Sequence, residues 1–178
     1  MRIISGIFKG KKLFLPTKNT RPLKDLVKES IFNLIQHSNK INISIEDSSV
    51  LDLFAGSGSF GIECLSREAK KVVFFENHPE AISILEKNIK FYENLEKYEI
   101  YKKDCFNFFN TSQILNSKFD IIFIDPPYKE LRINEIIEKI FEKKILNKEG
   151  IIIIHRHKKD SIQITKKLNI FENRSYGI

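Results

Sequence analysis

The chain has 178 residues and a formal net charge of +7, and its length indicates one domain that buries its core without disulfides or metal ions. No apolar run approaches the roughly 20 residues that cross a bilayer, and residues 1–12 lack the apolar region of a signal peptide, so we expect a cytoplasmic protein. The two cysteines, Cys64 and Cys105, lack CxxC or zinc-type spacing, so we expect both to be reduced and structural.

The excess positive charge lies in residues 1–28, which contain eight basic side chains and one acidic side chain, Asp25. The rest of the chain is electrically balanced. A basic arm on a neutral body is typical of a protein that binds a polyanion. A lysine-rich composition alone would explain the number of lysines but not this asymmetry, so the pattern favours nucleic acid as the partner.

Residues 1–22 form the basic arm, in which apolar and polar side chains alternate, and a small hairpin turning at Gly10 is predicted. A helical pattern follows over residues 23–36, with Val27, Ile31, Leu34 and Ile35 on one face. Residues 39–49 are polar and read as a linker. We expect the arm to be an appendage of a single domain that spans residues 23–178.

Beyond residue 49, short apolar runs alternate with helical patterns. Strands are predicted at 50–54, 72–75, 98–101, 121–124 and 151–154, and helices at 60–69, 79–92, 106–115, 133–145 and about 160–168. Strands with little polar alternation are buried on both faces, and helices between them imply right-handed crossovers. The predicted fold class is α/β, with a mostly parallel, doubly wound sheet of the Rossmann type.

The first predicted strand runs into VLDLFAGSGSFGIE at residues 50–63. Gly56, Gly58 and Gly61 satisfy GxGxxG, and Glu76 lies about 20 residues later, which fits a nicotinamide-binding fold. Against this, a carboxylate at Asp52 would disfavour a pyrophosphate at the following helix N-terminus. Carboxylates also follow other strands, at the edge where open sheets bind ligands. The full set is Asp52, Glu76, Asp104 and Asp125.

These residues resemble the class I S-adenosylmethionine-dependent methyltransferases. DLFAGSG looks like their first motif, Glu76 like the acid that holds the ribose hydroxyls, and Asp104 like the acid that meets the adenine amine. Carboxylates can accept hydrogen bonds from each of these donors. Helix capping is the alternative role for Glu76 and Asp104. The expected cofactor-binding residues are Asp52, Phe54, Gly56, Ser57, Gly58, Glu76, Asn77, Asp104 and Cys105.

The fourth strand ends in FDIIFIDPPYKE, residues 119–130. An exocyclic base amine is a poor nucleophile, and hydrogen bonds to the Asp125 carboxylate and the Pro126 carbonyl would fix the direction of its lone pair. Pro127 stiffens the loop, and Tyr128 offers a ring on which an extruded base can stack. A plain turn is the alternative. The motif resembles that of enzymes that methylate exocyclic amines of adenine, cytosine or guanine.

Four blocks in order resemble the bacterial small-subunit ribosomal RNA guanine-N2 methyltransferase family: RIISGIFKGKKL, TRP before a helix with ESIFN, VLDLFAGSGSFGIECLSR, and FDIIFIDPPY. The resemblance implies transfer of a methyl group from S-adenosylmethionine to guanine N2 in 16S ribosomal RNA of a small subunit or an assembly intermediate, with S-adenosylhomocysteine as product. We expect the chain to act as a monomer without a metal ion. RNA contacts are expected from Arg2, Lys9, Lys11, Lys12 and Arg21.

The residues are also compatible with three different functions. A DNA adenine-N6 methyltransferase would need a target-recognition segment, for which only the short arm is left. A non-catalytic RNA-binding assembly factor could have the same fold, although the intact glycine loop and DPPY motif argue against it. A nicotinamide enzyme would fit the glycine pattern alone.

Two features depart from the family. Its members usually continue past a Tyr-Gly such as Tyr176-Gly177 into a final antiparallel strand, so either that strand is missing here, which leaves residues 169–177 as a lone last strand, or the sequence is truncated. After the fifth strand, His155, Arg156 and His157 have no third metal ligand nearby and read as a solvated basic loop.

Overall fold

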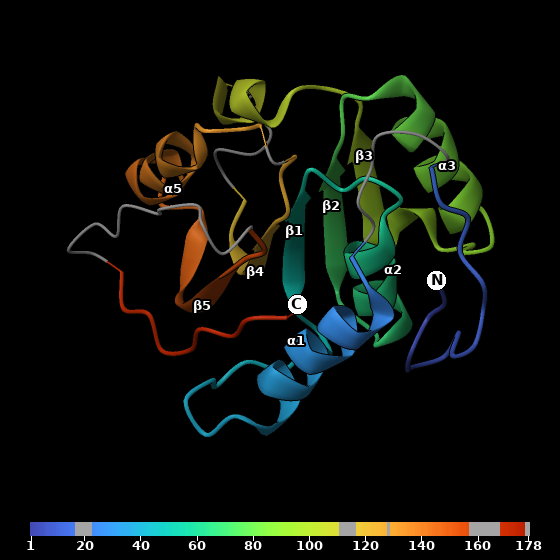
Figure 1. Cartoon of the computed structure of the whole chain (residues 1–178), viewed down its shortest axis with the longest axis horizontal. Coiled ribbons are helices and arrows are strands. Elements are labelled where there is room, and N and C mark those ends of the chain that lie inside the picture. The colour runs from blue at the N-terminus through green and yellow to red at the C-terminus, as the bar shows by residue number, and fades with distance from the viewer. Residues whose placement is uncertain (17–22, 111–116, 128, 157–167, 177–178) are drawn as a thin grey trace.

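The computed structural model describes residues 1–16, 23–110, 117–127, 129–156 and 168–176. Its centre is a five-stranded sheet in the order β3-β2-β1-β4-β5, and every pairing in it is parallel (Figure 1). The strands are β1 (Ser49–Leu53), β2 (Lys71–Phe75), β3 (Tyr98–Tyr101), β4 (Phe119–Ile124) and β5 (Leu146–Ile154). The predicted α/β fold with a parallel, doubly wound sheet is confirmed.

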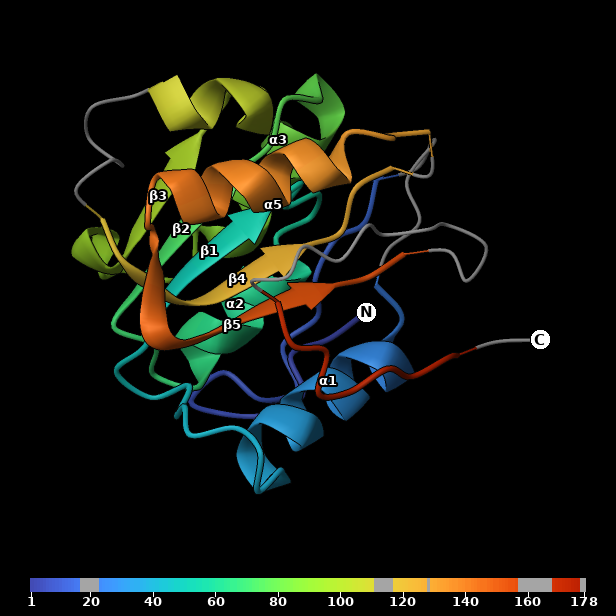
Figure 2. The same ribbon diagram turned by 90° about the vertical axis from the view of Figure 1, so that its left-hand side faces the viewer.

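Helices cover both faces of the sheet (Figure 2). They are α1 (Asp25–His37), α2 (Ser59–Ser66), α3 (Pro79–Ile89), the short 3-10 helices η1 (Leu95–Lys97) and η2 (Cys105–Asn110), and α5 (Ile133–Glu142). One core lies between the sheet and α1, α2 and α3, and the other between the sheet and η2 and α5. The inner strands β1, β2 and β4 therefore bury side chains on both faces, which is why their sequences show little polar alternation, whereas the edge strands β3 and β5 are mostly half-buried.

The direction of winding reverses between β1 and β4. The chain leaves β1 for α2 on one face and leaves β4 for α5 on the other, while Leu53 and Ile124 pair side by side at the carboxyl ends of these strands. Open α/β sheets bind ligands at such a switch point, because the two departing loops separate there. This topology brings the glycine loop and Asp125 to one place.

The N-terminal segment, residues 1–16, is packed onto the domain. Ile3 is 0% exposed and Leu13 is 6% exposed, and both belong to the core that contains α1 and α2. Its two limbs pair through a single antiparallel bridge, Arg2 with Lys12, and Gly10 has a positive φ of 86°. The predicted pairing is present without forming strands, but the expectation of an appendage is wrong, because burial of apolar side chains holds this segment down.

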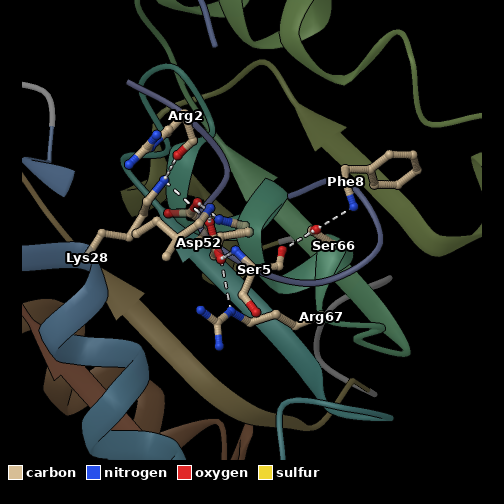
Figure 3. Close-up of polar contacts among 10 residues, drawn as sticks. Arg2, Ser5, Phe8, Lys28, Asp52, Ser66 and Arg67 are labelled. Atoms are coloured by element: carbon tan, nitrogen blue, oxygen red, sulfur yellow. Dashed lines mark hydrogen bonds and ion pairs between the residues drawn. The ribbon is translucent and has the colours of Figure 1, made fainter. Parts of the chain in front are cut away.

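A buried ion cluster fastens this segment to α1 and α2 (Figure 3). Lys28 and Glu63 are both 0% exposed; Lys28 Nζ lies 3.5 Å from Glu63 Oε2 and donates to the carbonyl of Arg2 at 2.8 Å. The same carboxylate accepts from Arg67 Nε at 2.9 Å and from the backbone amides of residues 4 and 5. Burial lowers the pKa of Lys28, and the charge of Glu63 opposes that effect.

Other elements differ from the predictions. The described part of the predicted helix at 106–115 is the 3-10 helix η2, and the predicted helix at 160–168 lies almost wholly outside the described residues. The helix predicted at 79–92 ends at Ile89. In the linker, Ile41 and Ile45 are buried and belong to the core that contains α1, so these two residues anchor the connection to the domain.

Residues 168–176 form no strand, so the alternative of a lone last strand is wrong for the residues that the structure describes. They run beside α1: the hydroxyls of Tyr176 and Ser30 contact each other, and Arg174 Nη1 lies 3.3 Å from Ser30 Oγ. No helix within the described ranges is long and apolar enough to span a membrane.

Candidate active site

The glycine loop that follows β1 is held against the end of β2. The amide of Ala55 donates to the Phe75 carbonyl at 2.8 Å, and the amide of Gly56 donates to Glu76 Oε2 at 2.7 Å. Phe54 has a positive φ of 61°, an uncommon conformation for a bulky residue and one that marks functional loops. The chain therefore turns sharply at the carboxyl edge of the sheet, and the backbone of the glycine loop runs across that edge.

Gly56 and Gly58 have different roles in this loop. A Cβ on Gly58, which has a φ of 77°, would lie 2.2 Å from Leu85 Cδ1, so this glycine permits close packing on α3. A Cβ on Gly56, with a φ of 56°, would meet only the Phe54 carbonyl at 4.0 Å. The space above Gly56 is therefore open to an approaching ligand.

Asn88 links this loop to the N-terminal segment, and sequence reasoning missed it. Its Nδ2 donates to the Ser57 carbonyl at 2.9 Å and to the Phe14 carbonyl at 3.0 Å, while Oδ1 accepts from the Phe14 amide at 2.7 Å. The side chain is 3% exposed. An asparagine on the predicted helix carries no signal of such a role, since its partners are distant in the sequence.

Asp52 is buried where β1 ends. It is 1% exposed, and its Oδ2 accepts a hydrogen bond from the Gly61 amide at 3.0 Å in the first turn of α2. Burial raises the pKa of Asp52 to about 8, against the opposing effect of the Gly61 bond, and the charges of Asp125 and Glu76 raise it further. A cation beside this carboxylate would favour its ionised form.

Glu76 and Asp104 make local contacts with the backbone. Glu76 Oε1 accepts from the amides of Asn77 and His78 at 2.9 and 2.8 Å, and Asp104 Oδ1 accepts from the Phe106 amide at 2.9 Å. Asp104 therefore makes the capping contact expected of the alternative role at the start of η2, whereas the amides that Glu76 binds precede α3, which has no side-chain cap. These contacts leave further acceptor capacity, because each carboxylate oxygen has two lone pairs.

The three remaining polar positions in the predicted cofactor set differ in exposure, and Ser57 is 7% exposed. Asn77 is exposed after β2, whereas Cys105 is 3% exposed within the core. Burial raises the pKa of the Cys105 thiol well above its usual range, so this thiol stays protonated. Both cysteines are free and buried.

Asp125 follows β4 and is paired with a histidine that follows β5. The Oδ1 of Asp125 and the Nδ1 of His155 are 2.8 Å apart, and their side chains are 21% and 19% exposed. The prediction of a solvated loop is therefore wrong for His155. Pro126 is buried and Pro127 is exposed, while Tyr128 and His157 lie outside the described residues.

The loop after Asp125 is fastened at its far end. Arg132 pairs with Glu130, whose pKa is lowered by that hydrogen bond, and the Arg132 guanidinium lies 3.6 Å from the centroid of the Phe106 ring. Arg156 Nη1 donates to the Glu130 carbonyl at 2.7 Å. Contacts from η2 and from the end of β5 thus hold this loop, and neither set has a sequence signature.

The basic residues of the N-terminal segment lie at the surface. Arg2, Lys9, Lys11 and Lys12 are exposed, and Arg21 lies outside the described residues. The Lys11 ammonium also stands 3.9 Å from the centroid of the Phe91 ring. Among the residues that the structure describes, no three His, Cys, Asp or Glu side chains are grouped so that they could hold a metal ion.

Comparison with known proteins agrees with this geometry. A family model described as conserved hypothetical protein 95 matches residues 1–178. The chain belongs to this family. A Haemophilus influenzae relative named ribosomal RNA small subunit methyltransferase D is 32% identical over 180 residues, covering 100% of this chain and 90% of the relative. The protein of that name from Buchnera aphidicola is 34% identical over 173 residues, covering 97% and 86%. The predicted family is confirmed.

Solved structures share this fold. A Haemophilus influenzae structure with 31% sequence identity has a TM-score of 0.77 and covers 99% of this chain and 92% of its own. A Thermus thermophilus structure has a TM-score of 0.76 at 22% identity and covers 99% and 94%. A more distant protein, solved with bound S-adenosylhomocysteine, has a TM-score of 0.56 at 20% identity, with 71% and 35% covered. The class I methyltransferase fold is confirmed.

Proposed function

We propose that this chain transfers a methyl group from S-adenosylmethionine to the N2 amine of a guanine in small-subunit ribosomal RNA. The observation that carries the proposal is the juxtaposition, at the β1–β4 switch point, of an open glycine backbone and the carboxylate of Asp125. The names of the relatives support the RNA substrate and the methyl transfer.

The residues around β1 and β2 fit a ligand that carries positive charge. S-adenosylmethionine supplies an electrophilic methyl group on a sulfonium and also carries an ammonium group. Asp52 is a buried carboxylate without a cationic side chain in hydrogen-bond contact among the described residues, and the backbone at Gly56 leaves room for close approach. Glu76 and Asn77 would accept hydrogen bonds from the ribose hydroxyls, and Asp104 would accept one from the adenine amine.

Asp125 would aim the guanine amine. Its carboxylate and the Pro126 carbonyl lie at the end of β4 and would each accept one N–H, which directs the nitrogen lone pair at the reacting carbon. Electrostatic attraction to Asp125 would also stabilise the positive charge that develops on the nitrogen during transfer. Pro126 is buried and so holds this part of the loop against the domain. Stacking of the base on Tyr128 is part of the same proposal.

The N-terminal segment would bind RNA phosphates. Arg2, Lys9, Lys11 and Lys12 are exposed on a segment whose backbone is fixed by core packing, so the charges are presented with little loss of conformational entropy. Arg21 is assigned the same role. A small subunit or an assembly intermediate is the proposed form of the substrate, with the chain acting as a soluble cytoplasmic monomer.

The test is methylation of small subunits that lack the modification, with labelled S-adenosylmethionine and nuclease digestion to identify the labelled nucleoside. We expect label on guanine N2, and Asp125→Ala to lower kcat by at least about 100-fold while the affinity for RNA stays the same. Glu149→Ala, which removes an exposed carboxylate at the other end of β5, is the matched control and should leave kcat unchanged.

Three outcomes would contradict the proposal. Label only on adenine N6 of DNA would make the chain a DNA methyltransferase. RNA binding without transfer by the wild type would make it an assembly factor. Calorimetric binding of NAD rather than S-adenosylhomocysteine would assign the glycine loop to a dinucleotide.

A further inference from the structure

We infer that His155 is a positioning residue that holds Asp125 in the orientation needed for methyl transfer. The inference rests on the proposed function and adds to it a residue outside the four-residue DPPY motif. Its basis is the 2.8 Å contact between His155 Nδ1 and Asp125 Oδ1 at the ends of two adjacent parallel strands.

The sheet register brings the two side chains together. Ile124 of β4 pairs with Ile154 of β5, and the amide of His155 donates to the Ile124 carbonyl at 3.0 Å, which continues the ladder by one more bond. The residues that follow, Asp125 and His155, are therefore neighbours at the same edge. This placement comes from the sheet and not from loop conformation, so it is as rigid as the strands themselves.

The contact determines how the two carboxylate oxygens are used. An ionised carboxylate can only accept, so Nδ1 of His155 carries the hydrogen in this bond. With Oδ1 held by His155, Oδ2 is the oxygen presented to a substrate amine. Without that bond the Asp125 side chain would be free to rotate, and the direction of the accepted N–H would no longer be defined.

A second contact from the same strand end supports this role. Arg156 Nη1 donates to the Glu130 carbonyl at 2.7 Å, so consecutive residues after β5 hold both ends of the loop that runs from Asp125 to Glu130. Both side chains of the His155–Asp125 pair are about one-fifth exposed, so the pair stays accessible from solvent at the carboxyl edge of the sheet.

The test separates the donor from the size of the side chain. In His155→Asn, the side-chain amide keeps a donor at the position of Nδ1, whereas His155→Leu keeps volume and loses the donor. We expect His155→Leu to lower kcat by roughly 10-fold to 100-fold with little change in the KM for RNA, and His155→Asn to recover most of that loss. His37→Leu, an exposed histidine at the end of α1, is the matched control.

A second readout does not depend on activity. Nitrogen NMR of the His155 ring should show the hydrogen on Nδ1 in the wild type, and Asp125→Ala should remove that preference. Equal kcat values for the wild type and His155→Leu, or a ring tautomer that ignores Asp125→Ala, would overturn the inference while leaving the proposed function intact. A wild type that methylates no guanine would instead overturn the proposed function, and the NMR comparison would still decide the pairing.

Discussion

The pKa of Asp52 shows how the surroundings of a single residue set its properties. Its carboxylate is 1% exposed, and burial raises its pKa to about 8 from an ordinary 3.8. Between these values the folded chain holds a proton that the unfolded chain has released. The contribution of Asp52 to the unfolding free energy is therefore fully present below about pH 4. This contribution is lost as the pH rises to about 8.

Asp52→Asn should remove this dependence, because asparagine keeps an acceptor for the Gly61 amide and carries no charge. The wild type should lose up to about 5 kcal/mol of unfolding free energy from this group between pH 4 and 8, and the variant should not. Urea denaturation at a series of pH values measures both. Parallel pH profiles for the two chains would show that the Asp52 carboxylate is not protonated in the fold.

The buried contact between Lys28 and Glu63 joins helix α1 to helix α2. Both side chains are fully buried, and Glu63 also binds two amides of the N-terminal segment. Lys28→Met should destabilise the fold by about 3 kcal/mol, because it leaves Glu63 with a weaker set of partners. Glu63→Gln should cost a similar amount, and the double variant should cost less than the two together.

Unfolding in urea of the single and double variants measures this coupling. Lys139→Met removes an ion pair with Glu135 that is partly exposed on α5, and it should change stability by less than about 0.5 kcal/mol. If the double variant loses as much unfolding free energy as the two single variants together, the result would contradict a direct interaction between the two buried charges.

The whole molecule carries its excess positive charge in residues 1–28, and its salt response should follow that distribution. Replacing Lys9 and Lys12 with glutamine should weaken binding to a small-subunit RNA fragment. Each lost phosphate contact should reduce the slope of log affinity against log salt by about 0.7–0.9. Replacing Lys143 and Lys148, which are exposed at the far end of α5 and in β5, removes the same net charge from the body.

Fluorescence titration at several salt concentrations measures both slopes. We expect the second pair of substitutions to leave the slope almost unchanged, because those lysines lie outside the proposed RNA-binding segment. Equal slopes for the two pairs would mean that RNA senses only total charge and that the basic segment has no special role.

Periodicity alone predicted the parallel sheet, since each strand that is buried on both faces must be apolar along its length, as Ile121 to Ile124 are. Strand ends were equally readable, so Asp52, Glu76 and Asp125 were identified as residues of one edge. The positions of glycines also carried information, because Gly56 and Gly58 adopt positive φ values that other residues avoid.

Only the tertiary structure decides which residues far apart in the chain contact each other. His155 reaches Asp125 through the β4–β5 register, and the burial of Lys28 depends on a glutamate of another helix. Likewise, Ile3 and Leu13 are core residues because α1 and α2 present a surface to them, which the alternation of residues 1–16 does not reveal. Local patterns determine elements, whereas the partners of polar and basic side chains depend on how the elements pack.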